Sequence, residues 1–153
     1  MSLRRALLVA FALLVAAPVT ALAGSVNVVG KGTATYAARG AATAFSTRLL
    51  AGSRVVVTAL PVATAPATVT VNCLNPRQRR CARFNARQNA WIISKPATLL
   101  VEGADFRLAL RSPRPFQLGI TGVGRLVLAG RGTYTTAGVD TPYLGRTIVK
   151  LRT

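Results

Sequence analysis

Histidine is absent from this chain, and acidic residues are almost absent. Without histidine, no side chain has an ordinary pKa near neutrality for general-base chemistry, and every histidine-dependent triad is excluded. Only Glu102, Asp105 and Asp140 carry carboxylates. A two-carboxylate hydrolase would need two of them facing each other across a cleft. We interpret Asp105 and Asp140 as turn residues and Glu102 as the partner of a nearby arginine, so the sequence predicts no enzyme.

Metal-ligating side chains are equally scarce. Two cysteines, no histidine and three scattered acids cannot supply the ligand set of a zinc site. Calcium prefers carboxylates clustered on alternating positions of a loop, and the sequence contains no such cluster. We therefore expect no metal and no cofactor.

The first 23 residues have the three parts of a cleavable secretory signal peptide. Arg4 and Arg5 form its positive region, an apolar run follows, and small residues precede Gly24. The apolar run has twelve residues before Pro18, whereas a membrane-spanning helix needs about 20. We predict cleavage before Gly24, and no membrane span in the exported chain.

The only two cysteines, Cys73 and Cys81, both lie in the part of the chain expected to be exported. Oxidising compartments favour disulfides, and two cysteines allow one intramolecular pairing. We predict a structural disulfide between them, which contributes about 2–3 kcal/mol for so short a loop. Together with the signal peptide, it predicts a secreted, periplasmic or cell-envelope protein.

Helical periodicity is missing beyond the signal peptide, and period-two alternation is common instead. In residues 106–111, for example, the apolar Phe106, Leu108 and Leu110 share one face. Such strands have one face on a core and one in water. Residues 24–153 are therefore expected to form a single all-β domain of many short, mostly antiparallel strands, arranged as a sandwich or barrel.

The expected strands are short, and glycine or proline marks the gaps between them. Residues 60–66 are the most linker-like piece, and we interpret them as a crossover between sheets. The strands are expected at residues 25–29, 32–38, 42–49, 54–60, 68–73, 90–94, 98–102, 106–111, 116–121, 125–129, 133–136 and 146–152.

Two short motifs resemble each other: Gly-Lys-Gly-Thr at residues 30–33 and Gly-Arg-Gly-Thr at residues 130–133. Neither leads into a helix pattern or into Gly-Lys-Ser or Gly-Lys-Thr, so neither is interpreted as a phosphate-binding loop. Two copies so far apart do not indicate a repeat protein. Glycines on one face of a strand permit bends, bulges or close packing. We interpret both motifs as strands with similar bending needs.

Positive charge is the most unusual property of the chain. It has 20 Lys and Arg against 3 Asp and Glu, a formal net charge of +17. Without Arg4 and Arg5 the charge would be +15. Such a charge favours acidic partners and opposes self-association through like surfaces. The alternative is a solvated basic surface that only keeps the protein soluble.

The best candidate binding site is the loop that the disulfide would close, with the residues that follow it. Guanidinium groups bind phosphate and carboxylate bidentately, and aromatic faces stack on sugars or bases. A disulfide that holds the loop would lower the ordering cost of binding. The alternative is a solvated basic hairpin whose aromatic side chains pack into the core. The candidate anion-binding residues are Arg77, Arg79, Arg80, Arg83, Arg87, Phe84 and Trp91.

Three arginines outside this loop serve as a comparison. Arg107, Arg111 and Arg125 fall in expected strands, and we expect them on separate strand faces. At least one is expected to be neutralised by Glu102 or Asp105. Their removal should therefore weaken anion binding less than removal of the loop arginines.

The sequence as a whole predicts an exported, non-enzymatic basic β-domain that binds an anionic polymer or surface. The candidate ligands are a wall polymer, an acidic polysaccharide, nucleic acid or lipid head groups. The alternative is a structural or assembly protein of the cell envelope, in which strand edges and glycine-rich faces join subunits. A distant alternative is a hydrolase that uses Glu102 or Asp105.

Overall fold

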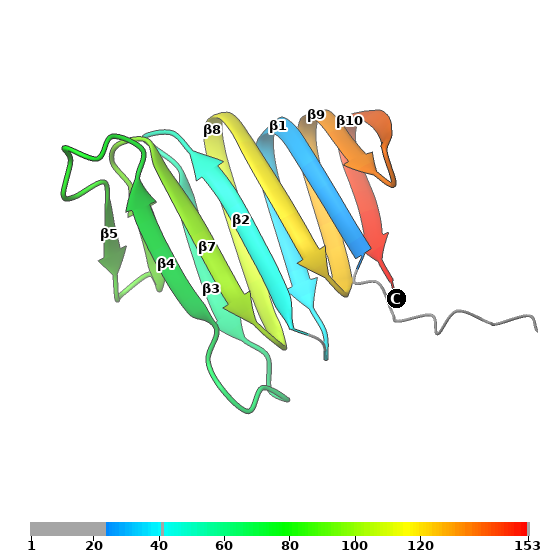
Figure 1. Cartoon of the computed structure of the whole chain (residues 1–153), viewed down its shortest axis with the longest axis horizontal. Helices are drawn as coiled ribbons and strands as arrows, with labels where there is room; N and C mark the ends of the chain where they lie inside the picture. The colour runs from blue at the N-terminus through cyan, green and yellow to red at the C-terminus, as the bar shows by residue number, and fades with distance from the viewer. Residues whose placement is uncertain (1–23, 41, 153) are drawn as a thin grey trace, which may run out of the picture.

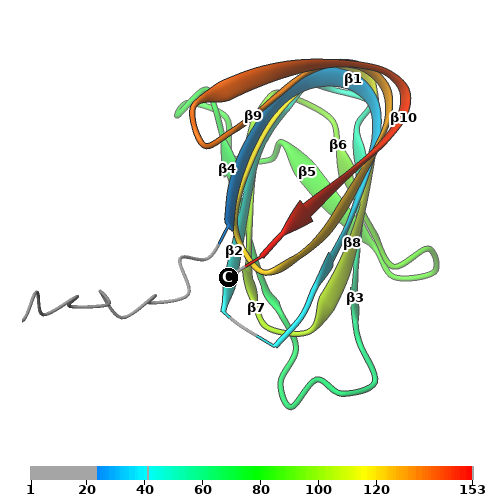
Figure 2. The same ribbon diagram turned by 90° about the vertical axis from the view of Figure 1, so that its right-hand side faces the viewer.

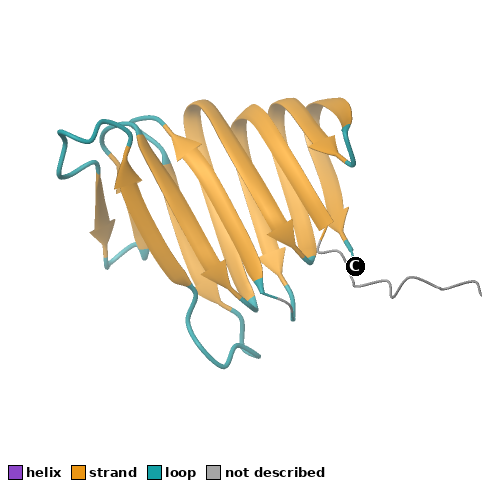
Figure 3. Cartoon of the chain, in the orientation of Figure 1, coloured by secondary structure: helices purple, strands orange, loops and turns teal. Residues whose placement is uncertain are grey.

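The computed structural model describes residues 24–40 and 42–152. The predicted signal peptide, residues 1–23, lies outside the described residues. The described chain contains no helix and forms one antiparallel sheet of ten strands in one compact domain (Figures 1 and 3). The predicted all-β, single-domain fold is therefore confirmed. None of the described residues forms a helix long and apolar enough to cross a membrane.

The ten strands are joined by short loops. They are β1 (Gly24–Ala38), β2 (Thr43–Leu49), β3 (Arg54–Ala59), β4 (Thr68–Cys73), β5 (Ala82–Asn85), β6 (Ala90–Ile93), β7 (Ala97–Gly103), β8 (Phe106–Gly122), β9 (Gly124–Thr136) and β10 (Val139–Leu151).

The sheet folds over on itself, so that one sheet makes both layers of a sandwich (Figure 2). The long strands β1, β8, β9 and β10 bend midway and take part in both layers. β8 also branches, because residues 117–121 pair with β2 while residues 106–111 pair with β3. Layer A is β4, β7 and β2 with the adjoining halves of the long strands. Layer B is β5, β6 and β3 with the other halves.

The long strands bend along one line that crosses the sheet at the two glycine motifs. Residues 30–32 of β1 pair directly with residues 130–132 of β9, in antiparallel register. In β8 the same line contains residues 113–115, which form an irregularity opposite β1. The two motifs are thus neighbouring strand bends, as their glycine pattern predicted.

Glycine and proline bend strands here where the sequence led us to expect strand ends. The segments expected at residues 25–29 and 32–38 are one strand, β1, and β8 and β9 were likewise each expected as two. Proline is tolerated in a sheet at a bulge or an edge, and Pro142 lies in β10, which pairs only with β9. The strand β5 was not expected at all. Residues 60–66 do cross between the layers, from β3 to β4.

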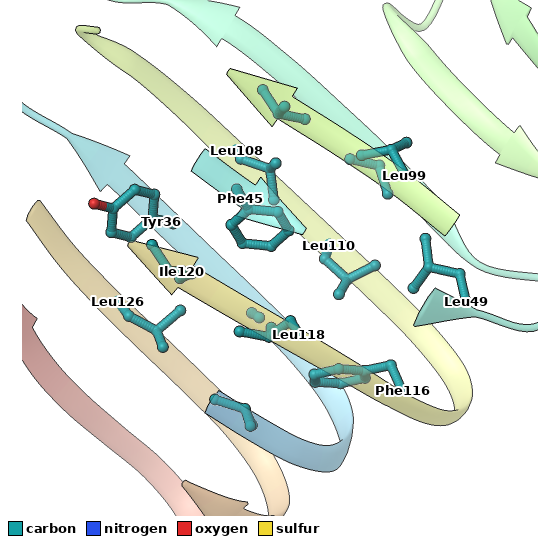
Figure 4. Packing of buried hydrophobic residues seen from close by; sticks show 14 of the residues in the cluster. Tyr36, Phe45, Leu49, Leu99, Leu108, Leu110, Phe116, Leu118, Ile120 and Leu126 are labelled. Carbon is teal, nitrogen blue, oxygen red and sulfur yellow. The ribbon is translucent and has the colours of Figure 1, made fainter. Parts of the chain in front are cut away.

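The core fills the space between the layers (Figure 4). Tyr36, Phe45 and Phe106 are fully buried, and the ring centroid of Tyr36 lies 6.3 Å from that of Phe45 and 6.2 Å from that of Phe106. Burial raises the pKa of the Tyr36 hydroxyl and that of the Tyr143 hydroxyl above the usual value for tyrosine. Because the inward positions are apolar, the charged side chains are left to the outer faces and the loops.

The predicted disulfide between Cys73 and Cys81 is confirmed, with the two Cα atoms 5.5 Å apart. Cys73 ends β4, the last strand of layer A, and Cys81 directly precedes β5, the last strand of layer B. The bond therefore ties the two layers together at the end of the molecule farthest from β10.

Candidate anion-binding face

The outer faces of the two layers differ in charge. Successive residues of a strand point to opposite faces, and residues paired across strands share a face, so the register identifies the outward side chains. The outer face of layer A is mainly threonine, serine, asparagine and glutamine, with Arg48, Glu102 and Asp140. The strands of layer B have no outward acidic residue. Their outward basic residues, which we call the basic face, are Arg54, Arg83, Arg107, Arg111, Arg125, Arg146 and Lys150.

One row of the basic face crosses four neighbouring strands. Arg107 of β8 and Arg125 of β9 flank Ala37 of β1, and Lys150 of β10 pairs with Arg125. Ala37 is too small to separate the two guanidinium groups. Neighbouring strands are about 4.8 Å apart, so β8 and β10 are roughly 14 Å apart. The basic side chains of this row, Arg107, Arg125 and Lys150, therefore all lie within roughly 14 Å across the sheet.

A second row lies four residues nearer the bend. Arg54 of β3 pairs with Arg111 of β8, and Arg146 of β10 lies beyond Thr33 and Ala129 in the same row. At about 3.3 Å per residue the two rows are roughly 13 Å apart along the strands. The basic residues of β8 and β10 thus border a strip of small side chains on β1 and β9.

A groove of about 640 Å³ lies over part of this strip and reaches the connection between β8 and β9. Its floor includes Thr35, Ala37 and Val127. None of the basic side chains around it takes part in an ion pair with another described residue. The basic residues that line it are Arg39, Arg107, Arg125, Arg146, Lys150 and Arg152.

The expectation that Arg107, Arg111 and Arg125 lie on separate strand faces is wrong. All three point outward from layer B, because β1 pairs with β8 on one side and with β9 on the other. Neither expected acid neutralises them. Glu102 belongs to the outer face of layer A, and Asp105 is engaged in a turn.

The three carboxylates have different surroundings. Asp105 Oδ1 accepts a hydrogen bond from the backbone N–H of Gly40 at 2.8 Å, and Asp140 Oδ1 accepts one from the Thr135 hydroxyl. Asp105 therefore serves a turn backbone, as predicted. Asp140 lies in β10 and accepts from a side chain of β9, so its predicted role at a turn backbone is wrong. Glu102 forms no ion pair with any described residue, so its predicted pairing with an arginine is wrong. In the described ranges, no three residues among His, Cys, Asp and Glu gather to hold a metal.

The arginine-rich loop predicted from the sequence forms a separate basic region. Arg77, Arg79 and Arg80 are exposed between β4 and β5, in the loop that the disulfide closes. Asn75 shapes this loop, because its side-chain oxygen accepts from the backbone N–H of Arg77 at 3.0 Å and its carbonyl accepts from that of Gln78 at 3.0 Å. These two bonds form a turn at residues 75–78, and the loop lies at the opposite end of the sheet from β10.

Phe84 and Trp91 pair across the β5–β6 hairpin, with ring centroids 5.2 Å apart. They share a row with the fully buried Val55, so they point to the inner side of layer B. Arg83 points to the opposite, outer side and belongs to the basic face. Arg87 is exposed at the turn of the hairpin. The structure therefore brings the two aromatic rings together and separates them from Arg83.

Sequence reasoning missed the groove and did not single out Arg39, Arg146, Lys150 or Arg152. The sequence indicated a strand at residues 146–152, but it did not indicate which strands lie beside it. Comparisons of the chain with protein families, with curated proteins and with solved structures found no match.

Proposed function

We propose that this protein is a non-enzymatic binding module whose basic face holds an anionic polymer. The observation that carries the proposal is the separation of charge between the two layers. Seven basic residues share one outer face, whereas Glu102 and Asp140 lie on the other. Charge that served solubility alone would gain nothing from this separation, whereas a one-sided field attracts a polyanion.

The face suits a polymer better than a single anion for energetic reasons. An exposed ion pair is worth under about 1 kcal/mol, so one contact holds little. Several contacts release several counterions, and the affinity then falls steeply with salt concentration. The β-strands that carry the charges are hydrogen-bonded to neighbours, so little backbone ordering is required on binding.

Export to an oxidising compartment is part of the proposal. The disulfide supports it, because such bonds persist in oxidising surroundings.

The test compares two triple variants that remove the same formal charge. One replaces Arg107, Arg125 and Lys150 by glutamine, and the other replaces Arg77, Arg79 and Arg80. Salt-dependent elution from heparin resin is measured for both. We expect the first variant to elute at clearly lower salt, with a salt slope of log K smaller by roughly 2–3 because about three counterions fewer are released.

Other outcomes have distinct meanings. A larger loss in the second variant would move the site to the disulfide-closed loop. Equal losses would mean that the whole charge acts as a diffuse field without a site. No loss of binding in either variant would favour the second candidate function, assembly in the cell envelope.

A second candidate function is assembly in the cell envelope, favoured by the open sheet edges. β4, β5 and β10 each pair on one side only. β10 presents Val139, Leu144 and Ile148 with exposed fractions of 62%, 87% and 43%. Long unpaired edges are templates for strand pairing. Light scattering of the purified protein separates the candidates, since a monomer is expected of the binding module and a large particle of the assembly protein.

A further inference from the structure

Every aromatic side chain in the described part of the chain lies away from the basic face. Five are buried in the core: Tyr36, Phe45, Phe106, Phe116 and Tyr143.

The other three also lie off the basic face, although Phe84 is 49% exposed. Tyr134 is partly buried and packs against Tyr143, with ring centroids 6.4 Å apart. Phe84 and Trp91 pair on the inner side of layer B. Surfaces that bind single-stranded nucleic acid combine positive charge with aromatic platforms on which the bases stack. The basic face has the charge without the platforms.

The surface between the basic rows is made of small and aliphatic side chains. Midway between the rows, Thr35 of β1 pairs with Ala109 of β8 and with Val127 of β9. Thr35 and Val127, together with Thr33 and Ala129, form the strip on β1 and β9, which offers no ring and no carboxylate. A chain lying on this strip would have basic side chains on both sides, from β8 and from β10.

The basic residues at the corners of the strip are spread rather than convergent. Arg107 and Arg111 on β8, with Arg146 and Lys150 on β10, outline a rectangle of roughly 13 by 14 Å. A polymer with repeated anionic groups contacts more of these residues at once than a single phosphate or sulfate does. The groove overlies part of the same path and adds Arg39 and Arg152 at one end.

We infer that the ligand of the basic face is a flexible polyanion without bases, bound along the strands through its backbone charges alone. This inference rests on the proposed function and narrows it. Phosphodiester polymers and acidic polysaccharides share this chemistry. Single-stranded nucleic acids have the charge, but their bases find nothing on this face to stack on.

The test uses two oligomers of equal length and charge, one of thymidine and one of abasic sugar phosphates. Their dissociation constants for the purified protein are measured at fixed salt by fluorescence anisotropy. We expect the two constants to agree within about twofold, because only phosphates are bound. Each stacked base would strengthen thymidine binding by roughly fivefold to more than a hundredfold, so a thymidine preference beyond that twofold range would overturn the inference.

Three further measurements complete the test. The triple variant lacking Arg107, Arg125 and Lys150 should lose affinity for both oligomers equally. Polyphosphate and heparin of matched charge then distinguish the sources. Tighter binding of polyphosphate would indicate phosphate groups, and tighter binding of heparin would indicate sulfated or carboxylated sugars. Either result supports the inference. If none of the four probes binds, the proposed function itself is wrong, which is a different result from a preference for bases.

Discussion

Gly130 illustrates, at the scale of one residue, how the long strands bend. Its φ is +129°, and a Cβ atom there would meet the carbonyl oxygen of Lys31. Its partner Gly32 has a φ of +121°. Backbone conformations of this kind are disfavoured for residues that carry a Cβ. The pair thus lets β1 and β9 turn together from one layer into the other.

We predict that Gly130→Ala lowers the free energy of unfolding by about 2–4 kcal/mol, since strained backbone costs about 1–3 kcal/mol and displaced neighbours add to it. Urea denaturation measures the change. Gly138→Asn is the matched control: Gly138 has a φ of +76° with no atom within 4 Å of the added Cβ. Asparagine tolerates such a backbone, so the control should change stability by under about 1 kcal/mol. Equal losses would contradict the role of the close approach.

At the scale of elements, β5 is the least supported strand of layer B. It has four residues and pairs only with β6. The Cys73–Cys81 bond joins its start to the end of β4. β4 is itself an edge strand, which pairs only with β7. The disulfide therefore connects two strands that the sheet holds on one side each.

We predict that replacing Cys73 and Cys81 by serine lowers the free energy of unfolding by about 2–3 kcal/mol, because the unfolded chain loses a constraint over a short loop. Amide hydrogen exchange should accelerate first in β5 and β6 and last in β1 and β8, which have partners on both sides. A reductant acting on the unmodified protein should reproduce the effect, since the described chain has no other cysteine. Unchanged exchange in β5 and β6 would show that the sheet alone holds the hairpin.

At the scale of the whole molecule, the basic face costs stability when no ligand is bound. Like charges repel, and the chain has a net charge of +17. The rows of the basic face are roughly 13 Å apart, close to the Debye length of about 10 Å at 0.1 M salt. Added salt should therefore relieve much of this repulsion.

We predict that the melting temperature rises by roughly 3–5 °C between 10 mM and 300 mM sodium chloride, the shift that about 1 kcal/mol produces in a domain of this size. The variant lacking Arg107, Arg125 and Lys150 should melt higher at low salt and respond less to salt. Differential scanning calorimetry measures both. The variant of the three loop arginines is the control, because it removes equal charge from the opposite end of the sheet. Identical salt responses would contradict repulsion centred on the basic face.

The fold class and the disulfide could be predicted because both depend on local information. Alternation in residues 106–111 indicates a strand whatever it pairs with, and two cysteines allow one bond. Strand ends were predicted less well. A glycine or proline ends a strand in one setting and bends it in another, and the neighbouring strand decides which. Residues 82–85 were not expected to form a strand, so the sequence did not indicate that Arg83 and Phe84 point to opposite sides of the sheet.

The sequence by itself determined that this protein is an all-β domain with a large excess of positive charge and very few groups able to perform chemistry. Only the tertiary structure decided where that charge gathers. Arg107 and Arg125 lie on either side of Ala37, which is far from both along the chain, because β1 lies between β8 and β9 in one register. Register between distant strands depends on the packing of the whole sheet, so no local pattern could place the basic face.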